Sequence, residues 1–145
     1  MKFTTEITID LPRQRVIELF DNPDNLAKWQ SGLREFVHIS GETGMPGAKS
    51  RLLYKVSGRE VEMIETITVR NLPDEFSGTY EAKGVWNEVK NFFFEDGPGK
   101  TRWVSENEFR FKGLMAVMGF LMPGSFRKET QKQMNEFKRF AENEG

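Results

Sequence analysis

The chain has 145 residues, a formal net charge of −1 and nearly equal numbers of acidic and basic side chains, so we expect one domain without a nucleic-acid surface. It has no cysteine, which excludes disulfides, thiol nucleophiles and cysteine-bound metals. One histidine, His38, is too few for a histidine metal site or a Ser-His-Asp triad, and we expect no metal and no cofactor. The N-terminus lacks the apolar stretch of a signal peptide, and the longest apolar run, residues 114–122, is far shorter than the roughly 20 residues that span a bilayer. We therefore expect a cytoplasmic protein without integral membrane association.

The first third of the chain predicts a strand followed by two short helices. Apolar and polar residues alternate from Phe3 to Ile9, which is typical of a half-buried strand. Pro12 suits the first turn of a helix, and Asn22 followed by Pro23 gives a second start, with a side-chain cap before the proline. The second helix should end near Trp29.

Six further strands follow, separated by short turns rich in glycine, proline and asparagine. They are expected at residues 33–40, 48–57, 59–70, 76–82, 85–94 and 101–111. Short connections favour an antiparallel meander, because parallel neighbours need long crossovers. On the strand 59–70, one face should carry Val61, Met63, Glu65, Ile67 and Val69.

The strand 101–111 shows the clearest alternation in the chain. Its expected inward residues are Trp103, Ser105, Asn107, Phe109 and Phe111, and its expected outward residues are Arg102, Glu106, Glu108 and Arg110. A dry core rarely holds a polar pair in the middle of a strand without hydrogen-bond partners. The pattern therefore favours a lined cavity on this face.

The C-terminal segment changes to a helical period. From residue 126 to 141 apolar residues recur every three or four positions, which predicts an amphipathic helix. Its expected buried residues are Phe126, Met134 and Phe137, and its expected exposed residues are Lys132 and Lys138. The run from Leu114 to Met122 is apolar on nearly all sides, and Pro123-Gly124 should kink the helix between the two parts.

Several stretches carry a family resemblance that covers essentially the whole chain. They are residues 7–12 (Ile-Thr-Ile-Asp-Leu-Pro), residues 19–23 (Leu-Phe-Asp-Asn-Pro) through Trp29, the Leu72-Pro73 turn, residues 100–103 (Lys-Thr-Arg-Trp) and the final helix. With this order of elements, the chain resembles the START-like, or SRPBCC, superfamily. It is most similar to small bacterial members described as polyketide cyclase/dehydrase or lipid-transport proteins.

The resemblance implies an α+β helix-grip fold in a single domain over residues 1–145. In that fold a curved antiparallel seven-stranded sheet wraps around a long C-terminal helix, and two short helices follow strand one. The superfamily has no shared catalytic motif. Its metal-using relatives need histidine and carboxylate ligands, which a chain with His38 alone does not supply.

Glu65 is the candidate catalytic residue, because burial between Met63 and Ile67 would raise its pKa and suit it to proton transfer. The alternative is that it meets a buried donor or lies at a cavity mouth. The candidate ligand-binding residues are Tyr54, Met63, Glu65, Tyr80, Asn87, Asn91, Trp103, Ser105, Asn107, Met115 and Met118. For the asparagines and Ser105 the alternative is a polar network that fixes strand register, and for the methionines it is plain core packing.

Three functions remain open from the sequence. The leading hypothesis is a non-enzymatic binder or carrier of a small hydrophobic or amphipathic molecule, since the chain lacks a nucleophile-base pair and a metal set. The second is a cyclase or dehydratase that uses Glu65 on a polyketide-like or aromatic substrate. The third is an interaction module in which Leu114–Met122 docks on a protein or a membrane surface, and a homodimer is left open.

Overall fold

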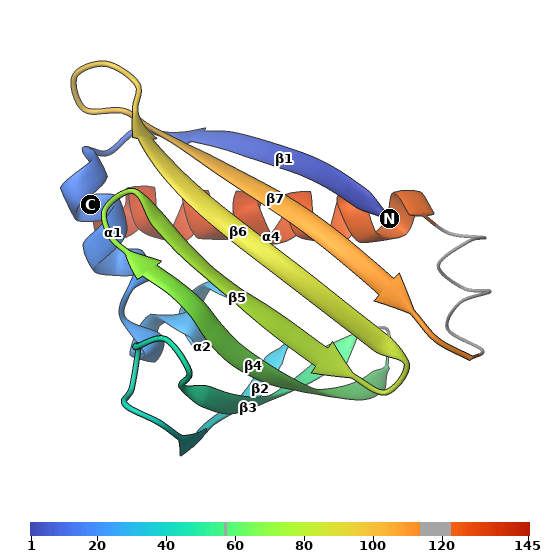
Figure 1. Cartoon of the computed structure of the whole chain (residues 1–145). Coiled ribbons are helices and arrows are strands. Elements are labelled where there is room, and N and C mark those ends of the chain that lie inside the picture. The colour runs from blue at the N-terminus through green and yellow to red at the C-terminus, as the bar shows by residue number, and fades with distance from the viewer. Residues whose placement is uncertain (57, 114–122) are drawn as a thin grey trace.

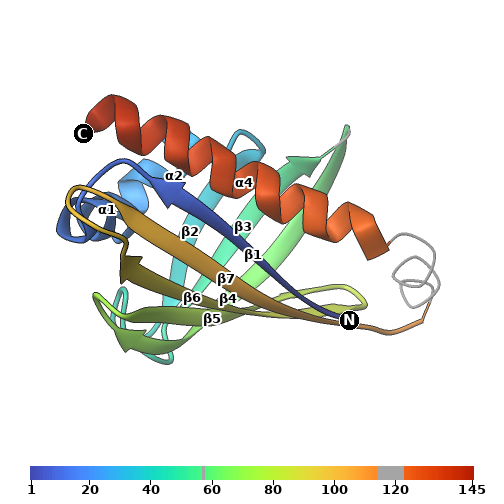
Figure 2. The same ribbon diagram turned by 90° about the horizontal axis from the view of Figure 1, so that it is seen from above.

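The computed structural model describes residues 1–56, 58–113 and 123–145. Within these ranges, seven strands form one curved sheet, and a long helix crosses its concave face (Figures 1 and 2). The strands are β1 (Lys2–Ile9), β2 (Leu33–Ser40), β3 (Lys49–Val56), β4 (Arg59–Asn71), β5 (Glu75–Ala82), β6 (Val85–Glu95) and β7 (Thr101–Phe111). The helical segments are α1 (Arg13–Phe20), the 3₁₀ turn η1 (Pro23–Asn25), α2 (Leu26–Trp29) and α4 (Pro123–Glu144).

The order of strands in the sheet is β1-β7-β6-β5-β4-β3-β2, and every neighbouring pair is antiparallel. The predicted helix-grip architecture and the meander from β2 to β7 are confirmed. The sequence did not assign a partner to β1, which pairs with β7 so that Thr5 lies opposite Ser105. This pairing joins the first strand to the last one, and α4 packs beside β1.

The helix starts follow their sequence signals. Asn22 caps the second helical segment, because its Oδ1 accepts a hydrogen bond of 3.0 Å from the backbone N–H of Asp24. The segment begins as the 3₁₀ turn η1 and continues as α2, which ends at Trp29 as expected. Asn25 is buried and donates its side-chain amide to the carbonyl of Leu19, which fixes α2 against the end of α1.

The core lies between the sheet and the three helices. Phe137 of α4 is fully buried, and its ring packs edge-to-face on Phe20, Trp29 and Trp103 at centroid distances of 5.8, 5.1 and 5.4 Å. Met134 is buried as predicted, whereas Phe126 is only half-buried, against the rings of Phe109 and Phe111. These contacts confirm that the odd-numbered residues of β7 face α4.

Polar side chains of α4 hold the free edge of β1. Arg127, Gln131 and Lys138 donate hydrogen bonds to the carbonyls of Thr4, Glu6 and Thr8 at 3.0, 3.4 and 2.6 Å. Lys132 is exposed as predicted, but Lys138 is half-buried, because its ammonium group bridges a β1 carbonyl and the carboxylate of Glu142. The helix is therefore fixed by both its apolar face and the polar residues along one side.

A β-bulge in β4 changes the predicted face of its last residues. Ile67 lies opposite Gly78, but the next paired residue, Val69, lies opposite Ser77. Adjacent residues of β5 point to opposite faces, so the expectation that Val69 shares a face with Ile67 was wrong. The bulge turns Arg70 inward instead, where it donates two hydrogen bonds of 2.7 and 2.6 Å to the carboxylate of Asp21 at the end of α1.

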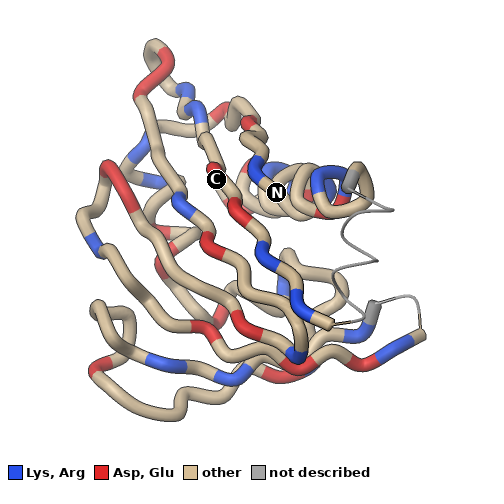
Figure 3. The backbone as a smooth tube through the Cα atoms, turned by 45° about the vertical axis from the view of Figure 1, so that its right-hand side comes forward, with Lys and Arg blue, Asp and Glu red and all other residues tan. Residues whose placement is uncertain are grey.

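Charged residues of both signs are interspersed with uncharged ones along the strands (Figure 3). This is the pattern expected where every second residue of a strand faces solvent. On β7, Glu106 and Arg110 are exposed as predicted, and the Arg110 guanidinium lies 4.5 Å from the ring centroid of Trp86. Glu108 and Arg102 are half-buried on the same outer face. No helix in the described part of the chain is long and apolar enough to cross a bilayer.

Candidate functional site

One row of side chains crosses the concave face of the sheet from β3 to β7. Glu65 of β4 lies opposite Ser50 of β3 and Tyr80 of β5, Tyr80 lies opposite Asn87 of β6, and Asn87 lies opposite Phe109. Directly opposed residues of antiparallel strands share a face. Phe109 packs against Phe126 of α4, so the whole row faces the helix.

Glu65 and Tyr80 form the centre of this row. The Tyr80 hydroxyl donates a hydrogen bond of 2.7 Å to Oε2 of Glu65. Burial raises the pKa of Glu65 above its usual value, and the Tyr80 hydrogen bond opposes that rise in part. Burial also raises the pKa of Tyr80, and the charge of Glu65 adds to the effect. A raised pKa makes the Glu65 carboxylate a stronger proton acceptor than an exposed one, whereas Tyr80 stays protonated and serves as a hydrogen-bond donor.

Tyr54 of β3 extends the site toward the helix pair. Its hydroxyl donates a hydrogen bond of 2.7 Å to Oε1 of Gln30, the residue that ends α2. Burial raises the pKa of Tyr54, with a further contribution from the charge of Glu65, so the hydroxyl stays protonated. The contact of Gln30 with the site could not be predicted from the sequence. A polar residue after a short helix carries no signal that it bonds to a strand residue 24 positions away.

Apolar side chains surround the Glu65 and Tyr80 pair. Leu33, Leu52 and Tyr54 are buried together, and Leu26, Phe36, Met63 and Tyr80 pack against them. Met63 and Val61 lie on the face of Glu65 by strand alternation, and Val61 lies opposite Tyr54. The carboxyl group thus lies on an apolar wall built from β3, β4 and β5.

The predicted polar residues of β6 and β7 form a second group with partners of their own. Asn91 accepts a hydrogen bond of 2.9 Å from Nε1 of Trp103, and Asn107 donates one of 3.0 Å to Ser105. Asn87 donates to the backbone carbonyl of Glu108 at 3.0 Å and lies 3.5 Å from Oδ1 of Asn107. As the sequence predicts, Asn87, Asn91, Ser105 and Asn107 lie together on the inward faces of β6 and β7, and their hydrogen bonds match the alternative of a self-satisfied polar network. Glu65 lies apart from this group, beside Tyr80.

Two predicted site residues cannot be placed. Met115 and Met118 lie in residues 114–122, outside the described part of the chain, as does the apolar segment expected to dock on a partner. The kink expected at Pro123-Gly124 would involve residues 114–122, so it also lies outside the described part of the chain. Among the described residues, Trp29 has a buried Nε1 without a hydrogen-bond acceptor.

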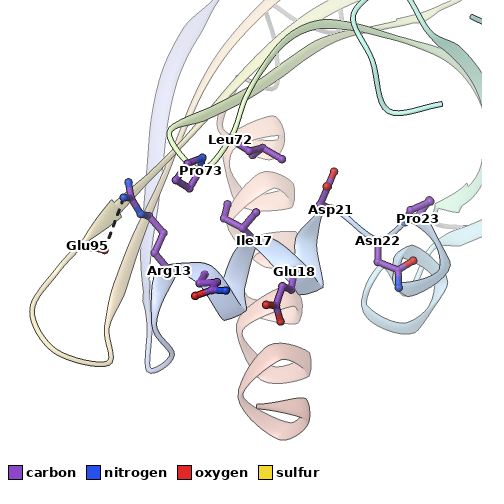
Figure 4. A pocket seen from close by; sticks show the side chains of 10 residues that line it. Arg13, Ile17, Glu18, Asp21, Asn22, Pro23, Leu72, Pro73 and Glu95 are labelled. Carbon is purple, nitrogen blue, oxygen red and sulfur yellow. Dashed lines mark ion pairs between the residues drawn. The ribbon is translucent and has the colours of Figure 1, made fainter. Parts of the chain in front are cut away.

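A surface groove of about 790 Å³ lies elsewhere, beside α1 (Figure 4). It runs between Ile17 of α1 and the turn at Leu72 and Pro73, with Arg13 and Glu95 at one end. Arg13 already forms ion pairs with Asp74 at 3.1 Å and Glu95 at 3.8 Å. The groove shares no residue with the row through Glu65. Among the described residues, no group of three histidine, aspartate or glutamate side chains is arranged to hold a metal ion.

The chain belongs to the family described as polyketide cyclase / dehydrase and lipid transport, which matches it over residues 1–142. This agrees with the START-like resemblance carried by the sequence. No curated protein is similar enough in sequence to count as a relative.

Solved structures show how widely this fold is shared. A START superfamily protein from Mycobacterium smegmatis has a TM-score of 0.84 and 10% identity, with 99% of each chain covered. The Zhui aromatase/cyclase from Streptomyces sp. R1128 has a TM-score of 0.81 and 13% identity, covering 98% of this chain and 93% of that one. A norcoclaurine synthase from Thalictrum flavum has a TM-score of 0.71 and 11% identity, covering 97% and 93%. Identities this low show a common fold and leave ligand and reaction open.

Proposed function

We propose that this protein binds and carries a small amphipathic molecule between the concave face of the sheet and α4. The observation that supports this most is the position of Glu65 and Tyr80, a hydrogen-bonded polar pair on an otherwise apolar wall. Ligand sites typically combine apolar walls with a few fixed polar groups. The family description, which includes lipid transport, supports the same class of function.

In this proposal the apolar body of the ligand packs on Phe36 and Met63, which are only partly buried, and its polar end meets Glu65 and Tyr80. The phenol of Tyr54 is already bonded to Gln30, which keeps that ring in place as part of the wall. The Asn91–Trp103 and Ser105–Asn107 bonds make the β6 and β7 side of the face rigid. A preformed wall of this kind lowers the entropic cost of binding, because little side-chain ordering is needed.

Titration with the neutral apolar fluorophore N-phenyl-1-naphthylamine tests this function. We expect saturable binding with an increase in fluorophore emission, and a higher melting temperature, since a ligand selective for the folded state stabilises it. Met63→Trp should block binding by filling the apolar wall. Glu18→Trp adds the same bulk to the α1 groove and should leave binding unchanged. Loss of binding in Glu18→Trp alone would place the ligand in the groove and contradict the proposal.

An enzymatic role is the second candidate, because Glu65 has a raised pKa and a hydrogen-bond donor beside it. A carboxyl group in this state can serve as a general acid or base in a cyclisation or dehydration. Glu65→Gln separates the two functions. If the protein is a carrier, the variant still binds N-phenyl-1-naphthylamine, and neither the variant nor wild type converts a substrate. In an enzyme it keeps binding and loses turnover of a polyketide-like or aromatic substrate.

A further inference from the structure

Glu65 has no positively charged partner among the described residues. None of the ion pairs among the described residues includes it. The residues outside the described part, Ser57 and 114–122, carry no charged side chain at all, so no cation from there can pair with it. Glu65 is therefore an acid on the ligand-facing wall whose charge is left uncompensated by the chain.

The groups next to Glu65 are hydrogen-bonding or apolar. His38 lies one strand further away, opposite Ser50, with its Nε2 2.8 Å from the carbonyl oxygen of Gly41. Tyr80 donates to Oε2, and no described residue donates to Oε1. Ser50, directly opposite on β3, is buried, and its hydroxyl makes no hydrogen bond to any described residue. The nearest inward cation along β4, Arg70, is five residues away and held by both oxygens of Asp21. One carboxylate oxygen and one hydroxyl thus remain for a ligand.

We propose that the polar end of the ligand is a protonated amine, which binds at Oε1 of Glu65 between the rings of Tyr54 and Tyr80. This inference rests on the proposed function and specifies its ligand class. An ammonium group supplies the missing opposite charge and donates to both Oε1 and the Ser50 hydroxyl, and tyrosine rings attract cations. A carboxylate ligand, such as a fatty acid, would meet a like charge with no cation to offset it. The site therefore selects against anionic lipids.

Three compounds with one apolar body and different polar ends test the inference: 2-(1-naphthyl)ethylamine, 2-(1-naphthyl)ethanol and 1-naphthylacetate. Their affinities for the full-length protein are measured by isothermal titration calorimetry at pH 7. We expect the amine to bind at least about tenfold more tightly than the alcohol, and the carboxylate to bind more weakly than both. Because this comparison uses the wild-type protein, it does not depend on the folding of any variant.

Two variants then assign the preference to Glu65. Glu65→Gln should remove the advantage of the amine while leaving the affinity for the alcohol within about threefold. Glu60→Gln, on an exposed position of the same strand, is the matched control and should keep the wild-type order. Melting curves of both variants confirm that they are folded.

The outcomes separate this inference from the proposed function. Equal binding of amine and alcohol, or an amine preference that survives in Glu65→Gln, overturns the inference and leaves the carrier function standing. Tightest binding of the carboxylate also overturns it. If none of the three compounds binds and N-phenyl-1-naphthylamine does not bind either, both proposals fail.

Discussion

Removing the ring of Phe137 is the sharpest test of how α4 packs on the sheet. The side chain is fully buried and contacts the rings of Phe20, Trp29 and Trp103 within 6 Å between centroids. Replacement of a core phenylalanine by alanine costs about 3–5 kcal/mol through lost burial and the cavity left behind. Each aromatic pair adds about 0.5–1.5 kcal/mol, so we expect the loss for Phe137→Ala to lie in the upper half of that range, at about 4.5 kcal/mol.

Urea unfolding monitored by circular dichroism measures this loss. With a slope of about 2 kcal/mol per molar urea for a chain of this size, the midpoint should fall by about 2 M. Arg139→Ala, at an exposed position of the same helix, should change the free energy of unfolding by less than about 0.5 kcal/mol. A loss below about 1 kcal/mol in Phe137→Ala would refute the packing described here, because no fully buried ring can be removed so cheaply.

Three further predictions concern polar contacts. Asp21→Asn should lower the free energy of unfolding by about 1–2 kcal/mol, because Arg70 then loses a half-buried charged partner. Arg15→Gln breaks only exposed contacts, an ion pair with Glu18 and a hydrogen bond to the carbonyl of Glu144, and should change the free energy of unfolding by less than about 0.5 kcal/mol. Glu65→Gln should become more stable relative to wild type as the pH rises. The pKa of Glu65 is raised in the folded state, so protonation of Glu65 stabilises the wild-type fold at low pH. Wild type loses this stabilisation as the pH rises from about 4.5 through the raised pKa, whereas the variant has no such group to titrate. Urea titrations at pH 4 and pH 8 measure the difference in free energy of unfolding between the variant and wild type. If this difference were the same at both pH values, the burial of Glu65 would be contradicted. Tyr80→Phe should raise the pKa of Glu65 further, because the hydrogen bond that lowers this pKa is lost. A pH titration of the Glu65 carboxyl signal by ¹³C NMR measures the change, and a lowered pKa in the variant would contradict the prediction.

The overall fold could be predicted because its signals are local. Alternation gave the strand from Thr101 to Phe111 with the ends that the structure shows, and helical spacing gave α4. The cap at Asn22 fixed the start of the second helical segment. The bulge after Ile67 could not be predicted, because an extra residue in one strand is defined by its partner strand and leaves no mark in the alternation itself.

The sequence predicted which face the candidate residues share, but not which hydrogen bonds they form. Strand alternation correctly placed Glu65 and Tyr80 on the inner face, and register then brought them together across β4 and β5. Alternation cannot say which inward polar groups bond to each other. The bond from Trp103 to Asn91 and the bond from Tyr54 to Gln30 depend on rotamers and on where α2 lies, and both are set by tertiary packing.

The two tyrosines of the chain offer the most direct test of the central claim, because Tyr54 and Tyr80 both line the proposed ligand wall. Protein labelled with ¹³C only in its tyrosine rings can be titrated with N-phenyl-1-naphthylamine and followed by NMR. We expect both ring signals to shift with the same saturation curve that fluorescence gives for binding. Saturable fluorescence binding with both tyrosine signals unmoved would contradict it, since the ligand would then lie away from Glu65 and the concave face.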